Sequence, residues 1–411
     1  MIPRGSAHRL SLPWGASPPG LEMVIHFPSS WQVTQVEPPV LRSLSREDIE
    51  RSIDQPIGSP GLRDVVRCGD KVVIAVDDMT RPLCVAPVLD TLIKKLELQR
   101  IGRKDVTILI AGGLHRQMAP EEIERKIGRD LVRSLPVVCR SAGDPAVEVQ
   151  LDDKRTAAID GRFIEADRRI LIGTVMPHLS AGYSGGAKLV MPGLASAADV
   201  EYMHKYLGML GKTATLSGNR FREYSEAVAR TVGTDYTIQL VPTPELEVAA
   251  AFSGDVVDAH RAAVDFLERK YSAPFPRDLD VAVLCAYPKD MDLYQTDNAF
   301  IAYKVAERLV RDGGTVVLAS ACTHGLGHHG LFEPGGPLSR PPQPLRLLVS
   351  RQLVGFVPGV TEPEFHTRYW EGYPHFGDWS EVLAYVSDRH GDSCRAGIVP
   401  MASLQLPTRG H

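Results

Sequence analysis

The chain has 411 residues, more than one hydrophobic core usually organises, so we expect two domains. Hydrophobic residues make up 44% and charged residues 23% of the chain, as in ordinary globular proteins, and a net charge of −4 predicts no general attraction to nucleic acid or membranes. With six cysteines but no CxxC pair, no apolar run of about 20 residues and no apolar signal-peptide core, we expect a reduced protein of the cytoplasm.

Alternating strands and helices are predicted along the chain. Five short runs of β-branched and apolar residues predict buried strands: 71–78, 106–113, 168–175, 279–287 and 314–320. Amphipathic segments such as 86–100 and 120–135 predict helices between them. This pattern predicts an α/β fold of two domains with mostly parallel sheets flanked by helices.

A segment rich in proline and charge, 272–280, follows a predicted helix and precedes a strand. We expect the linker there, between an N-terminal domain of residues 1–272 and a C-terminal domain of residues 278–411. A second segment rich in glycine and proline, 330–344, predicts a long loop inside the second domain.

Polar residues that suit chemistry follow four of the predicted strands. They form the stretches DDMTRP (77–82), LHR (114–116), MPHLSAGYSGGAK (176–188) and YPKDMDLYQ (287–295). In open α/β sheets, ligands bind beyond the carboxyl ends of the strands, so these stretches predict one assembled site. We expect this active site in the cleft between the two domains.

A glycine-rich loop precedes a lysine in the third of these stretches. Gly182, Gly185 and Gly186 let the backbone reach positive φ and approach a ligand, and free N–H groups there suit a phosphate. With Lys188 the loop is similar to a P-loop, but the GxxxxGK[ST] spacing fails and no Ser or Thr follows the lysine. A tight turn with a surface lysine stays open as the alternative.

Three histidines and an arginine are candidates for chemistry. His115 and His178 each follow a strand, where such side chains often act, while His204 lies in a helix that Ser196 is predicted to cap. A lone helical histidine is usually structural. Arg81 suits a substrate carboxylate, the alternative being an ion pair with a neighbouring aspartate.

Two further features stay open. The segment THGLGHHG (323–330) holds His324, His328 and His329, but their spacing matches no standard zinc pattern, and a flexible loop is favoured over a metal site. Trp379, near the start of a predicted helix, suits either a core position or the wall of a pocket.

Taken together, these stretches resemble the lactate racemase family. The resemblance covers most of the chain and rests on DDMTRP, GGLHRQM, PHLSAGYSGGAKLVMPG, HKYLG, YPKDMDLYQ and GDWSEVLAYV in that order. The spacing of His178, Lys188 and His204, 10 and then 16 residues, is similar to the family's signature. Their joint order and spacing make the resemblance specific.

The resemblance implies a nickel-pincer nucleotide, a pyridinium-3-thioamide-5-thiocarboxylate mononucleotide bound covalently to Lys188, and partner enzymes that synthesise it. His204 would complete the square-planar shell of Ni²⁺, a geometry that nickel(II) accepts with an imidazole ligand. By the same resemblance the nucleotide contacts Asp78, Thr80, Gly182, Ser184, Gly185 and Gly186.

The resemblance also implies a catalytic pair and a substrate pocket. His115 and His178 would be the acid/base pair, and Arg81 would orient the substrate. The pocket would be lined by Tyr294, Gln295, Asn298 and Trp379.

Such an enzyme is an isomerase that racemises or epimerises 2-hydroxy acids at carbon 2. The C–H bond beside a carboxylate is weakly acidic, so removing a hydride to the cofactor ring while a histidine takes the hydroxyl proton avoids a carbanion. Return of the hydride to the other face of the planar keto acid inverts the centre. The second histidine serves the opposite hand, because one base cannot reach the hydroxyl in both orientations.

Asn298 departs from the family pattern, which has a lysine at that position. A neutral amide that donates and accepts replaces a fixed cation, and Ala187 beside the lysine is small. We therefore expect a polyhydroxy sugar acid, an aldonate such as gluconate, to be favoured over lactate. Lactate or another small 2-hydroxy acid is the alternative.

Two functions of other classes stay open. A zinc-dependent hydrolase would use His115, His178 and His204 but leaves the glycine loop and Lys188 without a role. A non-catalytic nucleotide-binding protein would keep the loop without the acid/base pair. A covalent adduct on Lys188 would separate both from the racemase.

Overall fold

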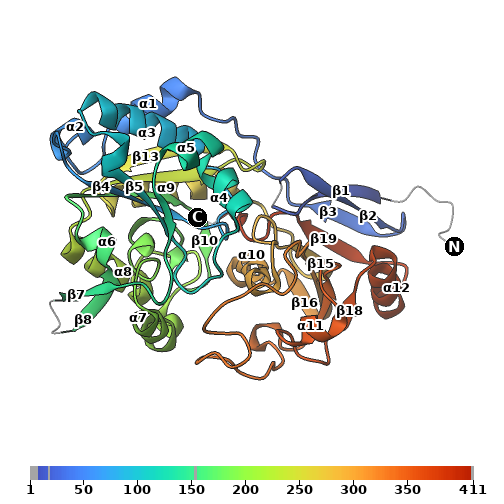
Figure 1. The fold of residues 1–411 in the computed structure, drawn as a ribbon. Helices are drawn as coiled ribbons and strands as arrows, with labels where there is room; N and C mark the ends of the chain where they lie inside the picture. The colour runs from blue at the N-terminus through green and yellow to red at the C-terminus, as the bar shows by residue number, and fades with distance from the viewer. Residues whose placement is uncertain (1–7, 17–18, 152–154, 409–411) are drawn as a thin grey trace.

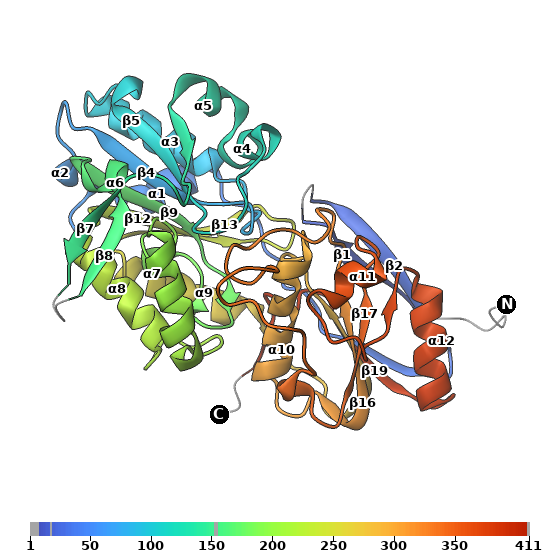
Figure 2. The ribbon, with the colours of Figure 1, turned by 60° about the horizontal axis from the view of Figure 1, so that its bottom comes forward.

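The computed structural model describes residues 8–16, 19–151 and 155–408. They form two α/β units that lie side by side, each built around a six-stranded sheet (Figure 1, Figure 2). Among the described helices, none is long and apolar enough to cross a membrane.

The sheet of the first unit is mostly parallel. Its strand order is β13 (Val248–Gly254), β12 (Tyr236–Pro242), β9 (Arg168–Thr174), β4 (Val72–Asp77), β5 (Val106–Ala111) and β6 (Val137–Cys139). Within this sheet β12 and β13 are antiparallel and the other neighbours are parallel. Every residue of β4 is buried, as expected for a central strand that is covered on both faces.

Helices cover both faces of this sheet. Along β4, Val72 and Ile74 pack toward one face and Val73 and Ala75 toward the other, because successive residues of a strand alternate. The first face packs against α1 (Arg46–Asp54), α3 (Ala86–Leu98) and α9 (Asp258–Tyr271). The second packs against α6 (Gly161–Ile164), α7 (Ala197–Tyr202) and α8 (Arg220–Val232).

The sheet of the second unit is parallel throughout. Its order is β18 (His375–Phe376), β17 (Gln352–Phe356), β16 (Val310–Ala319), β15 (Leu279–Cys285), β19 (Arg395–Val399) and β3 (Gln32–Gln35). One face packs against α10 (Phe300–Val305) and α11 (Glu362–His366), and the other against α12 (Trp379–His390) and the hairpin of β1 (His8–Trp14) and β2 (Leu21–Phe27).

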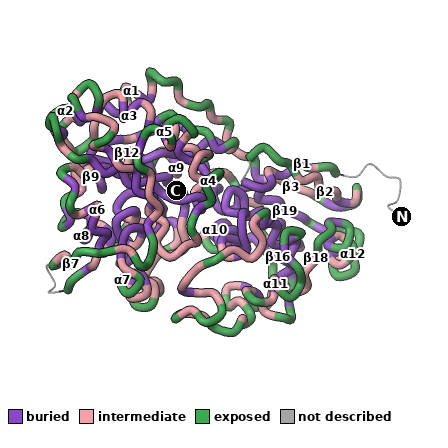
Figure 3. Tube along the Cα trace, in the orientation of Figure 1, coloured by how far each residue is buried: buried purple, intermediate pink, exposed green. Residues whose placement is uncertain are grey.

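The remaining elements are short or peripheral. They are α2 (Leu62–Val65), α4 (Pro120–Ile127), α5 (Arg129–Ser134), the hairpin of β7 (Ala146–Gln150) and β8 (Thr156–Asp160), and the pair of β14 (Ser272–Ala273) with β20 (Leu406–Pro407). Buried residues run through the interior of both units, while the outer helices carry the exposed positions (Figure 3).

The predicted α/β class with mostly parallel sheets is confirmed, and all five predicted strands are present as β4, β5, β9, β15 and β16. The helix predicted over 120–135 is interrupted: α4 and α5 are separate, because Gly128 between them has a φ of 94°.

The N-terminal segment belongs to the second sheet, which differs from the predicted domain range 1–272. Strand β3 pairs in parallel with β19, and the Trp14 ring lies 5.5 Å from that of Phe356. A boundary placed by local composition misses this, since the strand that β3 pairs with comes near the other end of the chain. Segment 272–280 does lead from α9 and β14 of one unit into β15 of the next.

Candidate active site

The candidate site lies at the carboxyl ends of β4, β5 and β9, which are adjacent parallel strands. The loops after these strands carry Arg81, His115 and Lys188, and all three side chains line one cavity of about 260 Å³. The second unit lines the same cavity through the loop after β15 and through η5 (Leu293–Ala299). Side chains from both units therefore meet in one place.

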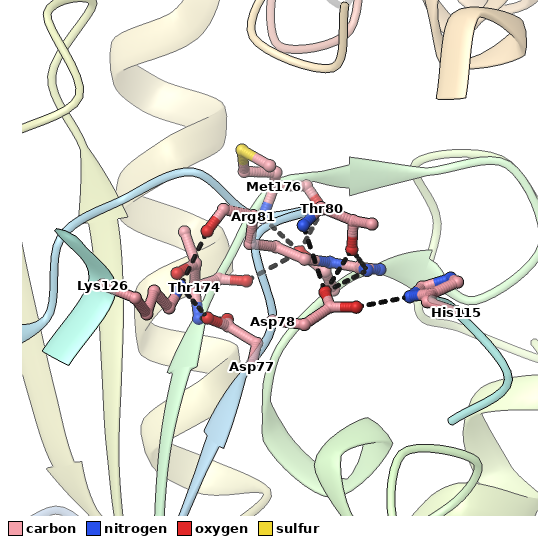
Figure 4. A network of polar contacts seen from close by, with 9 residues as sticks. Asp77, Asp78, Thr80, Arg81, His115, Lys126, Thr174 and Met176 are labelled. Atoms are coloured by element: carbon pink, nitrogen blue, oxygen red, sulfur yellow. Dashed lines mark hydrogen bonds and ion pairs between the residues drawn. The ribbon is translucent and has the colours of Figure 1, made fainter. Parts of the chain in front are cut away.

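Asp77 joins the ends of two of these strands. Its carboxylate pairs with the buried Lys126 ammonium and accepts a hydrogen bond from the Thr174 backbone N–H at 2.5 Å (Figure 4). Lys126 also donates to the Arg81 carbonyl at 2.7 Å. These contacts hold the loop after β4 against β9, so the next side chains along that loop have defined positions.

Asp78 orients the first candidate base. Nδ1 of His115 lies 2.6 Å from a carboxylate oxygen of Asp78 (Figure 4). A carboxylate can only accept, so Nδ1 carries the proton and Nε2 keeps its lone pair. Burial alone would raise the pKa of Asp78, but His115 and Arg81 hold it well below its ordinary value. Asp78 stands behind the histidine and does not line the cavity.

Thr80 anchors Arg81 to the same carboxylate. Its hydroxyl donates to Asp78 at 2.5 Å and accepts from Nη1 of Arg81 at 2.6 Å. Nη1 also lies 4.0 Å from Asp78, while Arg81 lines the cavity. In this structure Thr80 and Asp78 position Arg81 and His115, and the cofactor contacts expected of them stay a prediction.

His178 faces the same cavity from the short hairpin of β10 (Pro177–His178) and β11 (Gly182–Tyr183). Its Nδ1 accepts hydrogen bonds from the backbone N–H groups of Ser180 and Ala181, both at 3.1 Å. The neutral ring therefore carries its proton on Nε2. Burial lowers the pKa of His178 well below its ordinary value, and the nearby Lys188 lowers it further.

The glycine loop packs against the protein more than it faces the cavity. A Cβ at Gly182 would collide with the Thr215 carbonyl, and one at Gly186 would lie 2.9 Å from the His260 ring. Ser184 is buried and donates to the Thr174 carbonyl at 2.7 Å. Of the predicted loop contacts, Gly185 lines the cavity, whereas Gly182, Ser184 and Gly186 do not.

Lys188 lines the cavity from the short helix η2 (Gly186–Leu189), with its Nζ 5.7 Å from the centre of the Phe221 ring. Burial lowers the pKa of Lys188 well below its ordinary value, and the nearby guanidinium of Arg81 adds to the effect. A neutral amine is a nucleophile, so the position suits covalent attachment of a ligand.

His204 lies in the π-helical turn η3 (Met203–Leu207), which continues α7. Helix α7 begins as predicted, because the Ser196 side chain accepts from the Asp199 backbone N–H at 3.2 Å. Nδ1 of His204 lies 2.8 Å from the Val200 carbonyl, so Nδ1 carries the proton and Nε2 keeps a lone pair. Burial lowers the pKa of His204 to about 4, which leaves the ring neutral and able to bind a metal.

The second unit contributes two basic side chains to which the sequence analysis assigned no role. Tyr294, Gln295 and Asn298 line the cavity as predicted for η5, and so do Lys289 and Arg368. Arg368 pairs with Asp297, its guanidinium carbon lies 5.9 Å from the Tyr294 ring, and its buried Nε has no partner in the described part of the chain.

Trp379 lies away from the cavity. Its indole donates to the His26 carbonyl at 2.8 Å, and its ring packs edge-on against Phe27 and Phe356 at 5.4 and 5.5 Å. Because α12 lies on the outer face of the second sheet, this side chain serves the core between α12 and the β1–β2 hairpin. The pocket role predicted for it has no support in this arrangement.

The three histidines of segment 323–330 have different surroundings. His324 contacts Arg116 at 2.9 Å, and exposed His328 pairs with Glu333 at 2.5 Å. His329 turns into the cavity, where its ring lies 5.1 Å from that of His115. Within the described ranges no three His, Cys, Asp or Glu side chains form a metal-binding group, so a zinc hydrolase site built from protein ligands alone is not present there.

Sequence comparisons identify relatives of this chain. A family model for the lactate racemase N-terminal domain matches residues 21–217. A lactate racemase of Lactiplantibacillus plantarum is 28% identical over 385 residues, which span 86% of this chain and 89% of the relative. A lactate racemase of Thermoanaerobacterium thermosaccharolyticum is 27% identical over 299 residues, which span 71% of this chain and 69% of the relative.

Solved structures share the fold. The lactate racemase apoprotein from Thermoanaerobacterium thermosaccharolyticum matches with a TM-score of 0.75 at 21% identity, over 98% of this chain and all (100%) of that one. A Thermotoga maritima protein matches with a TM-score of 0.65 at 18% identity, over 88% of this chain and 98% of that one. The two α/β units with parallel sheets therefore recur as one architecture.

Proposed function

We propose that the chain is a member of the lactate racemase family, an isomerase, and that it inverts carbon 2 of a small 2-hydroxy acid, with lactate as the first candidate substrate. The observation that carries the proposal is the meeting of His115, His178 and Arg81 with Lys188 and His204 around one cavity. A base, a second imidazole, a carboxylate clamp, an attachment site and a metal ligand are the parts that this reaction needs.

The charge of the cavity supports an anionic substrate. Arg81 enters from the first unit and Arg368 from the second, while burial lowers the pKa of Lys289, which lines the same cavity. Guanidinium groups bind carboxylates through paired hydrogen bonds, so we assign the substrate carboxylate to Arg81 with Arg368 facing it. The first of these is anchored by Thr80, and the second has an unpartnered buried Nε among the described residues.

Arg368 weakens the case for a sugar acid. That case rested on Asn298 as the loss of a positive charge, but Arg368 lines the same cavity and pairs with Asp297, the residue before Asn298. The curated relatives bear the name lactate racemase. Lactate or another small 2-hydroxy acid is therefore the better-supported substrate class, and an aldonate such as gluconate is kept as the second candidate.

The implied cofactor fits the residues present. Lys188 offers an amine whose pKa burial lowers, His204 offers a free Nε2, and the amine of Lys289 offers hydrogen-bond donors for a phosphate. When bound, the pincer nucleotide would supply a nickel-carrying pyridinium ring that takes up the hydride from carbon 2 and returns it. Enzymes that synthesise the cofactor in the cytoplasm would be the partners for its installation.

The two histidines enter the reaction from different starting states. His115 presents a lone pair at Nε2 and is ready to accept the hydroxyl proton of one enantiomer. His178 presents Nε2–H, because two backbone N–H groups occupy its Nδ1. To serve as base for the opposite hand, His178 has to give up these contacts and move its proton to Nδ1. Arg81 keeps the carboxylate in place while the planar keto acid presents its other face.

The test is isomerisation by protein co-produced with cofactor-synthesis enzymes. L-Lactate and D-lactate should each approach the same mixture in chiral chromatography, and kcat/KM should be compared for lactate, malate, phenyllactate and gluconate. A protein that carries the cofactor and nickel yet inverts none of the four would contradict the proposal. A tenfold preference for gluconate would support the sugar-acid hypothesis, and the proposal that the protein is an isomerase would stand.

A further inference from the structure

The histidine loop of the second unit reaches across to the first. The Gly330 backbone N–H donates to the Leu114 carbonyl at 3.0 Å, and His329 forms a β-bridge with His115. Phe332, two residues beyond Gly330, places its ring 5.9 Å from that of His204. The loop is thus docked on the strand-end segment that carries the base.

The His329 ring lies close to both the proposed base and the candidate metal ligand. Its ring centre lies 5.1 Å from that of His115 and 6.1 Å from that of His204, both nearly edge-on, and 4.7 Å from that of Phe332. It is half-buried and lines the cavity, while the adjacent His328 is exposed and does not. Of these two neighbouring histidines, His329 faces the cavity and His328 does not.

The proton of His329 sits on the nitrogen opposite to that of His115. Nδ1 of His329 accepts the Leu331 backbone N–H at 3.3 Å, so the neutral ring carries its proton on Nε2. Nδ1 of His115 donates to Asp78, which leaves a lone pair on its Nε2. Among the hydrogen bonds of the described residues, the His329 ring takes part in one through Nδ1 and in none through Nε2.

A hydroxyl group is the ligand that satisfies both rings at once. It donates one hydrogen bond, which the lone pair of His115 can accept, and it accepts another, which Nε2–H of His329 can supply. A donor held at this oxygen also stabilises negative charge that develops there as the proton leaves. A carboxylate could use only one of the two rings.

We propose that His329 binds the oxygen on carbon 2 of the substrate, as the donor partner of the acceptor His115. This deepens the function proposed above and rests on it. Because a keto oxygen accepts hydrogen bonds as a hydroxyl oxygen does, the donor should hold the 2-keto acid as well as the 2-hydroxy acid.

The experiment compares three variants of the cofactor-loaded protein. His329→Phe keeps a ring and loses the donor, His329→Gln restores a donor, and His328→Phe is the matched control on the same loop. We expect His329→Phe to lower kcat/KM for L-lactate and the affinity for pyruvate by about 10- to 100-fold each, since a buried group loses its partner. His329→Gln should stay within about fivefold of wild type, and His328→Phe should match it.

Three results would overturn the proposal: His329→Phe with wild-type kcat/KM and pyruvate affinity, His329→Gln as impaired as His329→Phe, or equal losses in His328→Phe. If His329→Gln is as impaired as His329→Phe, the His329 ring contributes by packing and not as a donor. If His328→Phe shows equal losses, the effect comes from the docking of the loop. Intact mass and thermal unfolding establish that each variant is loaded and folded. If wild-type protein inverts no 2-hydroxy acid, the proposed function fails, and the pyruvate affinities of wild type and His329→Phe still decide the role of His329.

Discussion

His115 and His178 face one cavity with their protons on opposite nitrogens. Nδ1 of His115 donates to Asp78 at 2.6 Å, whereas Nδ1 of His178 accepts two backbone N–H groups at 3.1 Å. In the proposed reaction the first ring therefore starts as a base and the second as a donor. This difference comes from their immediate partners, so it can be altered by changing one atom of Asp78.

Asp78→Asn is expected to lower kcat for lactate by about 100-fold or more with little change in KM. The amide can donate to Nδ1 as readily as it accepts, so the base tautomer of His115 is no longer imposed, and general-base catalysis is worth about this much. Steady-state kinetics on cofactor-loaded protein measures it. Thr80→Val removes another partner of the same carboxylate and should cost less than about tenfold. Equal losses in both variants would contradict the role given to Asp78.

Lys188→Met should leave no cofactor mass on the protein, while Lys289→Met should retain it. Both lysines line the cavity and burial lowers the pKa of each, so they form a matched pair of amines. Only Lys188 lies on the loop between His178 and His204. Intact mass spectrometry of protein co-produced with cofactor-synthesis enzymes distinguishes them. An adduct that survives in Lys188→Met and disappears in Lys289→Met would move the attachment site.

Arg368→Gln is expected to raise KM for lactate by about tenfold or more, because a charge-assisted hydrogen bond to the carboxylate is lost. Asn298→Ala should change KM for lactate by less than about threefold. Since Arg368→Gln also leaves Asp297 without its ion-pair partner, the double variant with Asp297→Asn separates the effect on substrate binding from the effect of an unpaired carboxylate. A large effect of Asn298→Ala on gluconate but none of Arg368→Gln on lactate would favour the sugar-acid reading.

The buried His260 is expected to make the protein less stable as the pH falls. Its Nε2 lies 2.8 Å from the Ser184 carbonyl, and burial, with Arg222 nearby, lowers the pKa of His260 well below its ordinary value. The unfolded chain then binds more protons below pH ~6.5, so the free energy of unfolding falls as pH drops through that window.

Urea unfolding at several pH values between 5 and 8 measures this slope. In His260→Leu the slope should be smaller by up to ~1.4 kcal/mol per pH unit, whereas His328→Leu, at an exposed position, should keep it. Burial raises the pKa of Asp290 to about 6, which acts in the opposite direction, so slopes are compared between variants. An unchanged slope in His260→Leu would contradict the prediction.

The strands and the chemistry at their ends were predictable because both are local. Buried runs such as β4 and β9 have a clear apolar pattern, and parallel neighbours bring the residues after them together. The N-terminal strand β3 was missed, because its place is set by pairing with β19, far along the chain. A strand of four residues is too short for its sequence pattern to indicate which sheet it joins.

The rest of the site depends on how the two units dock. Arg368 follows a short helix and His329 lies in a loop, so neither stands at a strand end that would have marked it. The glycine loop was over-interpreted for a different reason. Gly186 is a glycine because the chain passes close to the His260 ring there, and a sequence cannot distinguish a glycine required by such packing from one required by a bound ligand. From the sequence, Trp379 at the start of α12 suited a core position and a pocket wall equally, and only the packing of α12 on the second sheet distinguishes the two.

We propose that carbon 2 is inverted while the hydrogen of that carbon is kept out of exchange with water. This is tested by incubating L-lactate with cofactor-loaded protein in D₂O and analysing both enantiomers by chiral separation and mass spectrometry. We expect D-lactate that carries no deuterium at carbon 2, because in the proposed reaction the hydrogen leaves and returns as hydride while the histidines transfer only the hydroxyl proton. D-Lactate that is deuterated at carbon 2 would contradict hydride transfer, and the absence of D-lactate from loaded protein would contradict racemisation of lactate itself.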